Sequence, residues 1–381
     1  MPTDRPAAPS APPAPGPVLT ALDPVFRVYN FDLLRILAAA QVVLGHSQSH
    51  LALGRPWFWG LVEAFPGVPV FFALSGYLIS ASFERSRDLR SYARNRLLRI
   101  LPGLWSVVLL TVVVTSLFGY SFLNLKALVW LPAQMVGLIY TPGFLKSFGF
   151  GSYNGALWTI PIELQFYVVL PLVYVIPMSE RRRTQLVAAA LAAFSVVTFF
   201  FVMGASPLSE GGDEPFSHKV YRYSFIPHID LFLTGVLLQR LRAHRSRWIT
   251  GKALPWLAVF CATYFGLHQW LVDHWTPARG AFTYVLCTQV MAVTVIACAF
   301  TMPRLSERLL RGNDLSYGVY IYHGLVIGAL LQMGLKGAWW QMGVVVAITF
   351  VVAMASWRLV EKPFLRRKKN ALHAVAGATK R

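Results

Sequence analysis

Residues 31–50 read FDLLRILAAAQVVLGHSQSH, an apolar stretch that contains a few ionisable side chains. About 20 mostly apolar residues make a helix long enough to cross the hydrocarbon core of a bilayer. The sequence therefore predicts an all-α, polytopic integral membrane helical bundle of about ten transmembrane helices, within residues 28–365. The further spans are predicted to begin near Pro66, Leu97, Ala156, Thr184, Phe225, Ala253, Ala281, Leu315 and Trp339.

The composition of the whole chain points to the same class of protein. Hydrophobic residues make up 56% of the 381 residues and charged residues only 13%, which excludes an ordinary soluble protein. The net charge of +19 would suggest nucleic-acid binding in a soluble chain, but here the basic residues form short clusters between the apolar stretches. We therefore expect membrane lipid, and no nucleic acid, as a partner. The three cysteines lie in apolar stretches without C-x-x-C spacing and are expected to be buried: Cys261, Cys287 and Cys298.

The basic clusters also predict the orientation of the helices, because lysine and arginine concentrate on the cytoplasmic side of short loops. The clusters within residues 85–99 and 181–183 should both be cytoplasmic. An even number of crossings then separates the third span from the span at Ala156, so residues 122–145 are predicted to be interfacial or re-entrant rather than an eleventh span. Both termini are then cytoplasmic. Residues 1–27 are expected to form a disordered Pro/Ala-rich tail rather than a signal peptide, and residues 366–381 a basic tail.

Ionisable side chains inside the predicted spans are candidates for function, because each costs about 2.5–3.5 kcal/mol to place in a bilayer. Four stand out: Arg35, His46, Glu163 and Asp230, the last beside His228. Arg35 and His46 are eleven residues apart, which on an α-helix is about 16 Å with a residual rotation of about 20°. They therefore share one helix face, which suits a long anionic ligand. The alternative is a snorkelling arginine and a histidine bonded to a backbone carbonyl.

Three further observations concern the chemistry that these residues can support. Glu163 lies at the depth of His46, so it is predicted to fix the tautomer of His46; alternatively, a protonated Glu163 forms an interhelical hydrogen bond. Arg96 and Arg99 precede the third span and either bind phosphate or only orient the helix and contact lipid headgroups. No metal is expected, because His46 and His50 are spaced like ligands on a helix but lack an H-E-x-x-H pattern.

Two other stretches have simpler interpretations. Residues 67–77, GVPVFFALSGY, place Ser75 outside a G-x-S-x-G pattern, and their small residues predict close helix packing. Residues 315–323, LSYGVYIYH, are typical of an interfacial aromatic belt.

Six segments, taken together and in order, resemble the membrane acyltransferase family 3, which includes O-antigen, exopolysaccharide and Nod-factor O-acyltransferases. They are residues 31–47, 67–77, 96–102, 157–167, 315–323 and 361–364, so the resemblance covers nearly the whole chain. Residues 31–47 match the opening motif, an arginine and a histidine separated by ten residues. The sequence departs from the family pattern at Gln41, at Pro161 and Ile162, and in the single Glu163 where many members have two.

The resemblance implies an enzyme that transfers an acyl group, most commonly acetyl, from acyl-CoA to a hydroxyl group in the bacterial inner membrane. The implied acceptor is a saccharide, a lipid-linked glycan or another hydroxyl compound. His46 would act as general base, or would carry the acyl group itself, and Glu163 would orient it. The donor phosphates would be held by Arg35, with Arg96 and Arg99. Substrate contacts would come from Trp158, Tyr167, Tyr77 and His323.

A transporter or exporter is the alternative function. Arg35, His46, Glu163 and Asp230 would then form a proton or substrate pathway across the membrane. We see no internal sequence repeat of the kind that many transporters carry, and this favours the enzyme.

Overall fold

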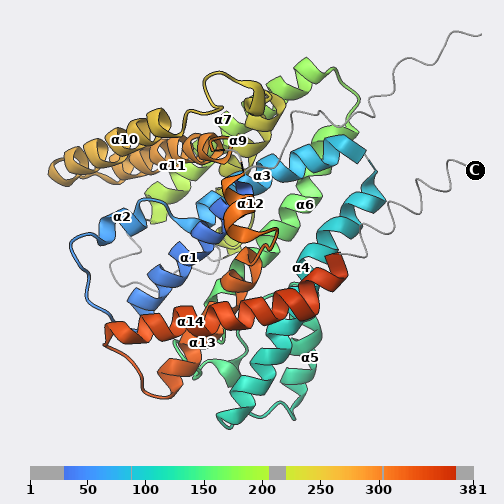
Figure 1. Ribbon diagram of the computed structural model, residues 1–381, viewed down its shortest axis with the longest axis vertical. Helices are drawn as coiled ribbons and strands as arrows, with labels where there is room; N and C mark the ends of the chain where they lie inside the picture. The colour runs from blue at the N-terminus through green and yellow to red at the C-terminus, as the bar shows by residue number, and fades with distance from the viewer. Residues whose placement is uncertain (1–29, 87, 206–219, 303, 366–381) are drawn as a thin grey trace, which may run out of the picture.

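The apolar stretches form helices at each of the ten places where a span was predicted to begin. The structure is a computed structural model that describes residues 30–86, 88–205, 220–302 and 304–365, so both predicted tails lie outside the described residues. Figure 1 shows the helices, which are α1 (Phe31–His50), α2 (Trp59–Glu63), α3 (Gly67–Ser86), α4 (Leu89–Leu117), α5 (Leu125–Met135), α6 (Thr159–Val175), α7 (Glu180–Ala205), α9 (Ile229–Arg240), α10 (Ala253–Asp273), α11 (Pro277–Ala299), α12 (Leu305–Leu310), α13 (Ser316–Gln332) and α14 (Trp339–Ser356). Short 3-10 turns form at Gly143–Leu145, Gly155–Trp158, Ile226–His228 and Ala243–Arg245, and a π turn at Trp357–Glu361.

Several of these helices have the length and hydropathy of membrane spans. Within the described ranges, six segments qualify: Trp59–Arg85, Leu89–Leu117, Gly155–Val175, Glu180–Gly204, Pro277–Ala299 and Trp339–Leu365. The all-α bundle with membrane-spanning helices is thus confirmed, whereas the number of ten spans and the cytoplasmic position of both termini stay predictions. In residues 122–145 the longest helix is α5, whose eleven residues rise about 16 Å. That is too short to cross a hydrocarbon core of about 30 Å.

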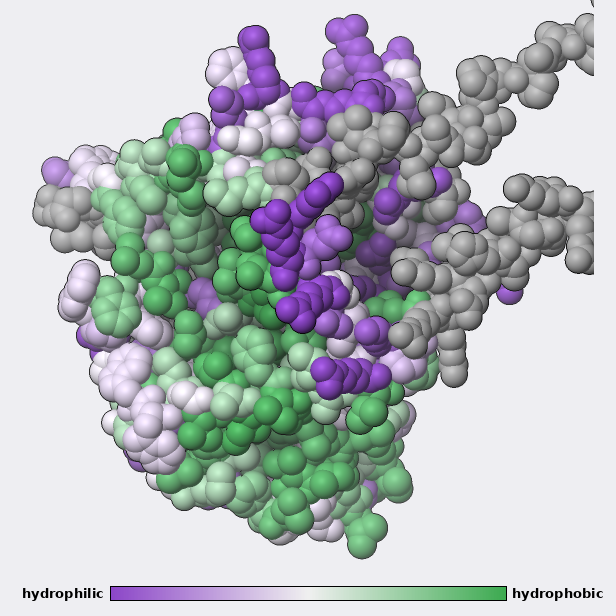
Figure 2. Space-filling model, viewed as in Figure 1, coloured by the Kyte–Doolittle hydropathy of each residue, from purple (hydrophilic) through white to green (hydrophobic). Residues whose placement is uncertain are grey.

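The outer surface of the bundle carries apolar side chains where a membrane would contact it. On α6, Val168, Leu172 and Val175 are all exposed and are spaced to lie on one helix face. Figure 2 shows hydrophobic surface over much of the visible face, with hydrophilic residues gathered toward its upper edge. A water-soluble protein rarely exposes so large an apolar area, so this face fits a lipid environment.

Close contact between α3 and α9 depends on two glycines. A Cβ atom on Gly76 would collide with the backbone carbonyl of Phe232, and a Cβ on Gly235 would collide with the carbonyl of Ala73. Gly67 lies equally close to α1, at the carbonyl of Ala38. The prediction that the small residues of 67–77 serve helix packing is therefore confirmed.

Helix α13 is buried along most of its length and packs against α1, α4 and α14. The interpretation of residues 315–323 as an interfacial belt is wrong, because all of them are buried. Their tyrosine hydroxyls find partners inside the bundle: Tyr317 donates to the Ile100 carbonyl at 2.9 Å and Tyr322 to Ser356 Oγ at 2.9 Å. A buried tyrosine with a satisfied hydroxyl is stable in the core, so the same residue types suit either location.

The cysteines follow the sequence prediction only in part. Cys287 is buried, Cys298 is half-buried and Cys261 is exposed on α10. In a membrane protein an apolar stretch has its outer face against lipid, so apolar composition alone does not predict burial within the protein.

Candidate active site

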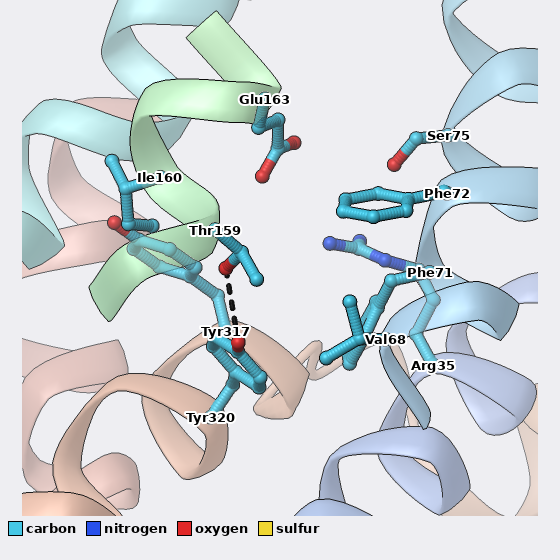
Figure 3. A pocket seen from close by; sticks show the side chains of 10 residues that line it. All are labelled: Arg35, Val68, Phe71, Phe72, Ser75, Thr159, Ile160, Glu163, Tyr317 and Tyr320. Atoms are coloured by element: carbon cyan, nitrogen blue, oxygen red, sulfur yellow. Dashed lines mark hydrogen bonds between the residues drawn. The ribbon is translucent and has the colours of Figure 1, made fainter. Parts of the chain in front are cut away.

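A small cavity of about 40 Å³ lies between α1, α3, α6 and α13. Its walls are mostly apolar and aromatic, and Figure 3 shows the guanidinium of Arg35 and the carboxylate of Glu163 both pointing toward its centre. Thr159 donates a hydrogen bond to the Tyr320 hydroxyl at 2.9 Å at the edge of this space. A small apolar cavity with a few convergent polar groups is where a functional site is first sought.

Arg35 is anchored by a carboxylate that the sequence analysis did not identify. Its Nη1 lies 2.8 Å from Oδ2 of Asp314, and Arg99 donates to the same oxygen. Ser316 completes the cluster by donating its backbone N–H and its hydroxyl to Asp314 Oδ1, at 3.1 and 2.5 Å. Asp32 lies near enough to both guanidinium groups to add a second acidic group. The cluster therefore ties α1, α4 and the start of α13 together.

The electrostatics of Asp314 follow from this environment. Burial alone would raise the pKa of its carboxyl, but the charges of Arg35 and Arg99 and the hydrogen bond from Ser316 hold that pKa well below its usual range. The carboxylate thus stays ionised, and each arginine has a permanent partner.

Arg96 differs from these two arginines. Its guanidinium lies over the rings of Tyr92 and Tyr167, at 5.9 and 5.8 Å from their centroids, and its buried Nε has no hydrogen-bond partner in the described part of the chain. It also lies close enough to Arg85 for the two charges to interact. A partly buried guanidinium with an unused donor is suited to bind an anionic group.

His46 is held by a second histidine. Its Nδ1 lies 2.9 Å from Nε2 of His323, and Nδ1 of His323 lies 2.6 Å from the backbone carbonyl of Tyr320. His323 is fully buried and His46 is half-buried. His50 stacks on Phe150, with ring centroids 3.9 Å apart.

The histidine pair lies beyond the cavity rather than in its wall. On α13, Tyr320 neighbours both Tyr317 and His323 at i,i+3 spacing, although Tyr317 and His323 are about 120° apart around the helix. On α1, Arg35 and His46 share a face. Tyr317 and Tyr320 line the cavity together with Arg35. His323 lies about one helical turn beyond Tyr320 on α13, whereas His46 lies about three turns, roughly 16 Å, beyond Arg35 on α1, and the two histidines meet outside the cavity.

The predicted contact between Glu163 and His46 is absent from the hydrogen bonds of the described residues. Tyr167 donates to Glu163 Oε1 at 2.5 Å, and His323 takes the place beside His46. The prediction that Glu163 lies at the depth of His46 is wrong, because Glu163 shares the cavity with Arg35, which is about 16 Å from His46 along α1. Glu163 instead faces Arg35 across the cavity.

The other predicted substrate residues lie in different places. Tyr77 is fully buried among Phe31 and Phe300, and its hydroxyl lies 3.2 Å from His244 Nδ1, so it does not line the cavity. Trp158 lines a second, neighbouring cavity together with Asp230.

Comparison with known proteins identifies the family of this chain. The family model described as an acyltransferase domain matches residues 28–358. The chain belongs to this acyltransferase family. Membership confirms the resemblance that the six sequence segments indicated.

Three relatives show the range of the family. Nodulation protein 10 of Rhizobium leguminosarum bv. viciae is 33% identical over 361 residues, which cover 90% of this chain and 94% of that protein. A putative peptidoglycan O-acetyltransferase of Bacillus subtilis is 27% identical and an O-acetyl transferase of Shigella phage Sf6 is 25% identical, over 88% and 90% of this acyltransferase. The chain spans 97% of the phage protein but only 54% of the Bacillus one. No solved structure matches the sequence significantly.

Proposed function

We propose that this acyltransferase moves an acetyl group from acetyl-CoA to a hydroxyl of a saccharide or lipid-linked glycan at the bacterial inner membrane, with His46 as the base. Two of its relatives are named as O-acetyltransferases, one of them, putatively, of peptidoglycan. The observation that carries the proposal is the hydrogen-bond chain from His46 through His323 to the Tyr320 carbonyl.

This chain fixes the protons on both imidazole rings. A backbone carbonyl only accepts, so Nδ1 of His323 must carry its proton and donate to Tyr320. In the neutral ring, Nε2 of His323 is then an acceptor, and Nδ1 of His46 must be the donor between them. The lone pair of His46 is thereby placed on Nε2, the nitrogen not used in this contact. A base whose tautomer is fixed by its other nitrogen is the arrangement that general-base catalysis requires.

The reaction that follows balances with this one base. Nε2 of His46 takes the proton of the acceptor hydroxyl as that oxygen attacks the thioester carbonyl of acetyl-CoA. The carbon–sulfur bond then breaks, and the leaving thiolate takes the proton back from the imidazolium. In a two-step version Nε2 attacks the thioester carbonyl and CoA leaves as the thiolate. The acceptor oxygen then takes the acetyl group from Nε2 and leaves its proton on that nitrogen, from which the thiolate finally removes it. Both versions need the same nitrogen free.

The donor phosphates are assigned to Arg96, supported by Arg85, on the predicted cytoplasmic side. Arg35 and Arg99 already share Asp314, so a phosphate that bound either arginine would have to compete with a buried carboxylate. Arg35 lies opposite Glu163 in the cavity.

The test uses purified protein in detergent, acetyl-CoA and a chitin tetrasaccharide, whose N-acetylhexosamine units resemble the sugars of peptidoglycan. Free CoA and the acetylated sugar are both measured. His46→Gln is expected to lower transfer by about 10²–10⁴-fold, the usual contribution of a general base. The matched control is His50→Gln, which should retain activity. Arg96→Gln should raise the KM for acetyl-CoA by about tenfold or more, because it removes a charged donor.

Each result discriminates between the proposed and the alternative function. Full activity of His46→Gln would contradict the role of the histidine. Binding of acetyl-CoA without any transfer to sugar would reject the acceptor class. Flux of a solute through vesicles without CoA-dependent product would instead favour the transporter.

A further inference from the structure

A second cavity, of about 190 Å³, lies beside the first and is built by α3, α7, α9 and α11. Val68 and Phe72 line both cavities, and Trp158 of the second is followed in the chain by Thr159 of the first. The two spaces therefore lie on either side of a shared wall. The second is lined by Thr198 of α7 and by residues 227–231 at the start of α9, and the predicted topology places the connection between these two helices on the outer side of the membrane.

Asp230 in this cavity has an unused hydrogen-bond acceptor. The residue is 1% exposed, its Oδ2 accepts from Gln289 Nε2 at 3.0 Å, and its Oδ1 has no partner within the described residues. Thr198 and the amide of Leu231 lie near the carboxylate, but Thr198 donates to the Pro227 carbonyl at 3.3 Å. An unsatisfied buried acceptor costs about 1–3 kcal/mol, so a ligand that donates to it gains that energy.

The remaining lining defines the kind of ligand. His228 donates its Nε2–H to the Arg222 carbonyl at 3.0 Å, which leaves Nδ1 of the neutral ring as a second acceptor. The rings of Trp158 and Phe72 lie 5.6 and 5.5 Å from the His228 ring, so aromatic surface surrounds the polar groups. A carboxylate repels phosphate, which excludes the donor phosphates from this space. Two acceptors beside aromatic faces suit a neutral ring that carries hydroxyl groups.

We propose that this second cavity binds one saccharide unit of the acceptor, with Asp230 Oδ1 accepting a hydrogen bond from a sugar hydroxyl and Trp158 packing against the ring. The site rests on the proposed function, because it supplies the acceptor side of that reaction. The acceptor sugar would then lie next to the cavity that contains Arg35 and Glu163, across the wall formed by Val68 and Phe72.

The experiment measures binding of the chitin tetrasaccharide by calorimetry, separately from acetyl transfer. Asp230→Asn keeps the shape of the side chain and the bond to Gln289 but removes the charged acceptor. It should weaken binding of the tetrasaccharide by about tenfold to a hundredfold, as expected for a hydrogen bond to a charged group. Acetyl-CoA binding should be unchanged. Trp158→Phe should also weaken sugar binding, and Asp88→Asn, an exposed helix cap outside both cavities, should not.

The outcomes separate the two proposals. Unchanged tetrasaccharide binding in Asp230→Asn, with the wild type still transferring acetyl, would overturn the site and leave the function intact. If the wild type does not bind the tetrasaccharide, the site is overturned as well, whether or not the protein binds acetyl-CoA. Loss of acetyl-CoA binding in Asp230→Asn would show that the residue acts on the fold, and Trp158→Phe then decides: unchanged sugar binding in that variant overturns the site.

Discussion

Replacing His323 by leucine tests the tautomer argument. In the protein, His46 Nδ1 donates to His323 Nε2 over 2.9 Å, and His323 is fully buried. Leucine removes the acceptor and keeps an apolar side chain. A buried donor left without an acceptor costs about 1–3 kcal/mol, which lowers the population of that tautomer by about 5- to 160-fold. Since only this tautomer leaves Nε2 free, we expect kcat to fall by the same factor while the KM for acetyl-CoA stays unchanged.

His323→Gln provides the matched variant. The oxygen of its amide can accept from His46 Nδ1, so this variant should recover kcat to within about tenfold of the wild type. A purely structural role for His323 would not produce this order of activities. Monodispersity and Tm of each variant in detergent report whether it has folded.

Nitrogen NMR of the wild type gives a readout that no folding defect affects. With ¹⁵N-labelled histidine, the signals of His46 are assigned by their loss in His46→Gln, and they should show a protonated Nδ1 and an unprotonated Nε2. A proton on Nε2 of His46 in the wild type, or full kcat in folded His323→Leu, would refute the reasoning.

Two further predictions concern stability. Asp314→Asn leaves two guanidinium groups without their shared counter-charge and should destabilise the protein by about 3–5 kcal/mol, seen as a lower Tm, whereas exposed Asp88→Asn should not. Because folding lowers the pKa of Asp314, the ionised carboxylate contributes its full stabilisation above pH 3.8, the ordinary pKa of an aspartate. This stabilisation should be lost only as the pH falls through the lowered pKa. An acid unfolding step above pH 3.8 that disappears in Asp314→Asn would contradict the prediction. Gly76→Ala should lower Tm because its Cβ meets the Phe232 carbonyl, whereas Gly343→Ala on α14, with open space around it, should keep or raise Tm; equal Tm in both would contradict the packing.

The positions of the helices could be predicted from the sequence because each depends on the hydropathy of one continuous segment. Burial within the bundle could not, since lipid and protein interior accept the same apolar residues. Residues 315–323 show the difficulty: aromatic composition fits an interface and a core equally, and only the partners of Tyr317 and Tyr322 distinguish them. The i,i+3 spacing of Tyr320 and His323 was the available signal that these two side chains are neighbours on α13.

The site was predictable where one helix carries it. The shared face of Arg35 and His46 follows from helical geometry alone. Asp314 was missed because its bond to Arg35 joins residues far apart in the chain, although the Asp-x-Ser pattern that starts α13 is a helix-start signal. The partner of His46 was assigned to Glu163 from its distance to the end of its own span, but this count does not determine how α6 is placed against α1: Glu163 lies opposite Arg35, and α13 presents His323 to His46.

The distribution of counter-charges separates the roles of the three arginines that the sequence grouped together. Arg35 and Arg99 are satisfied by Asp314, so a ligand that bound them would have to compete with a buried carboxylate. Arg96 has a buried Nε without a partner in the described chain and aromatic rings on its faces, so an anion there gains a charged hydrogen bond and breaks none. The phosphates of the donor should therefore bind at Arg96, while Arg35 and Asp314 hold α1 against α13 and so keep His46 within reach of His323.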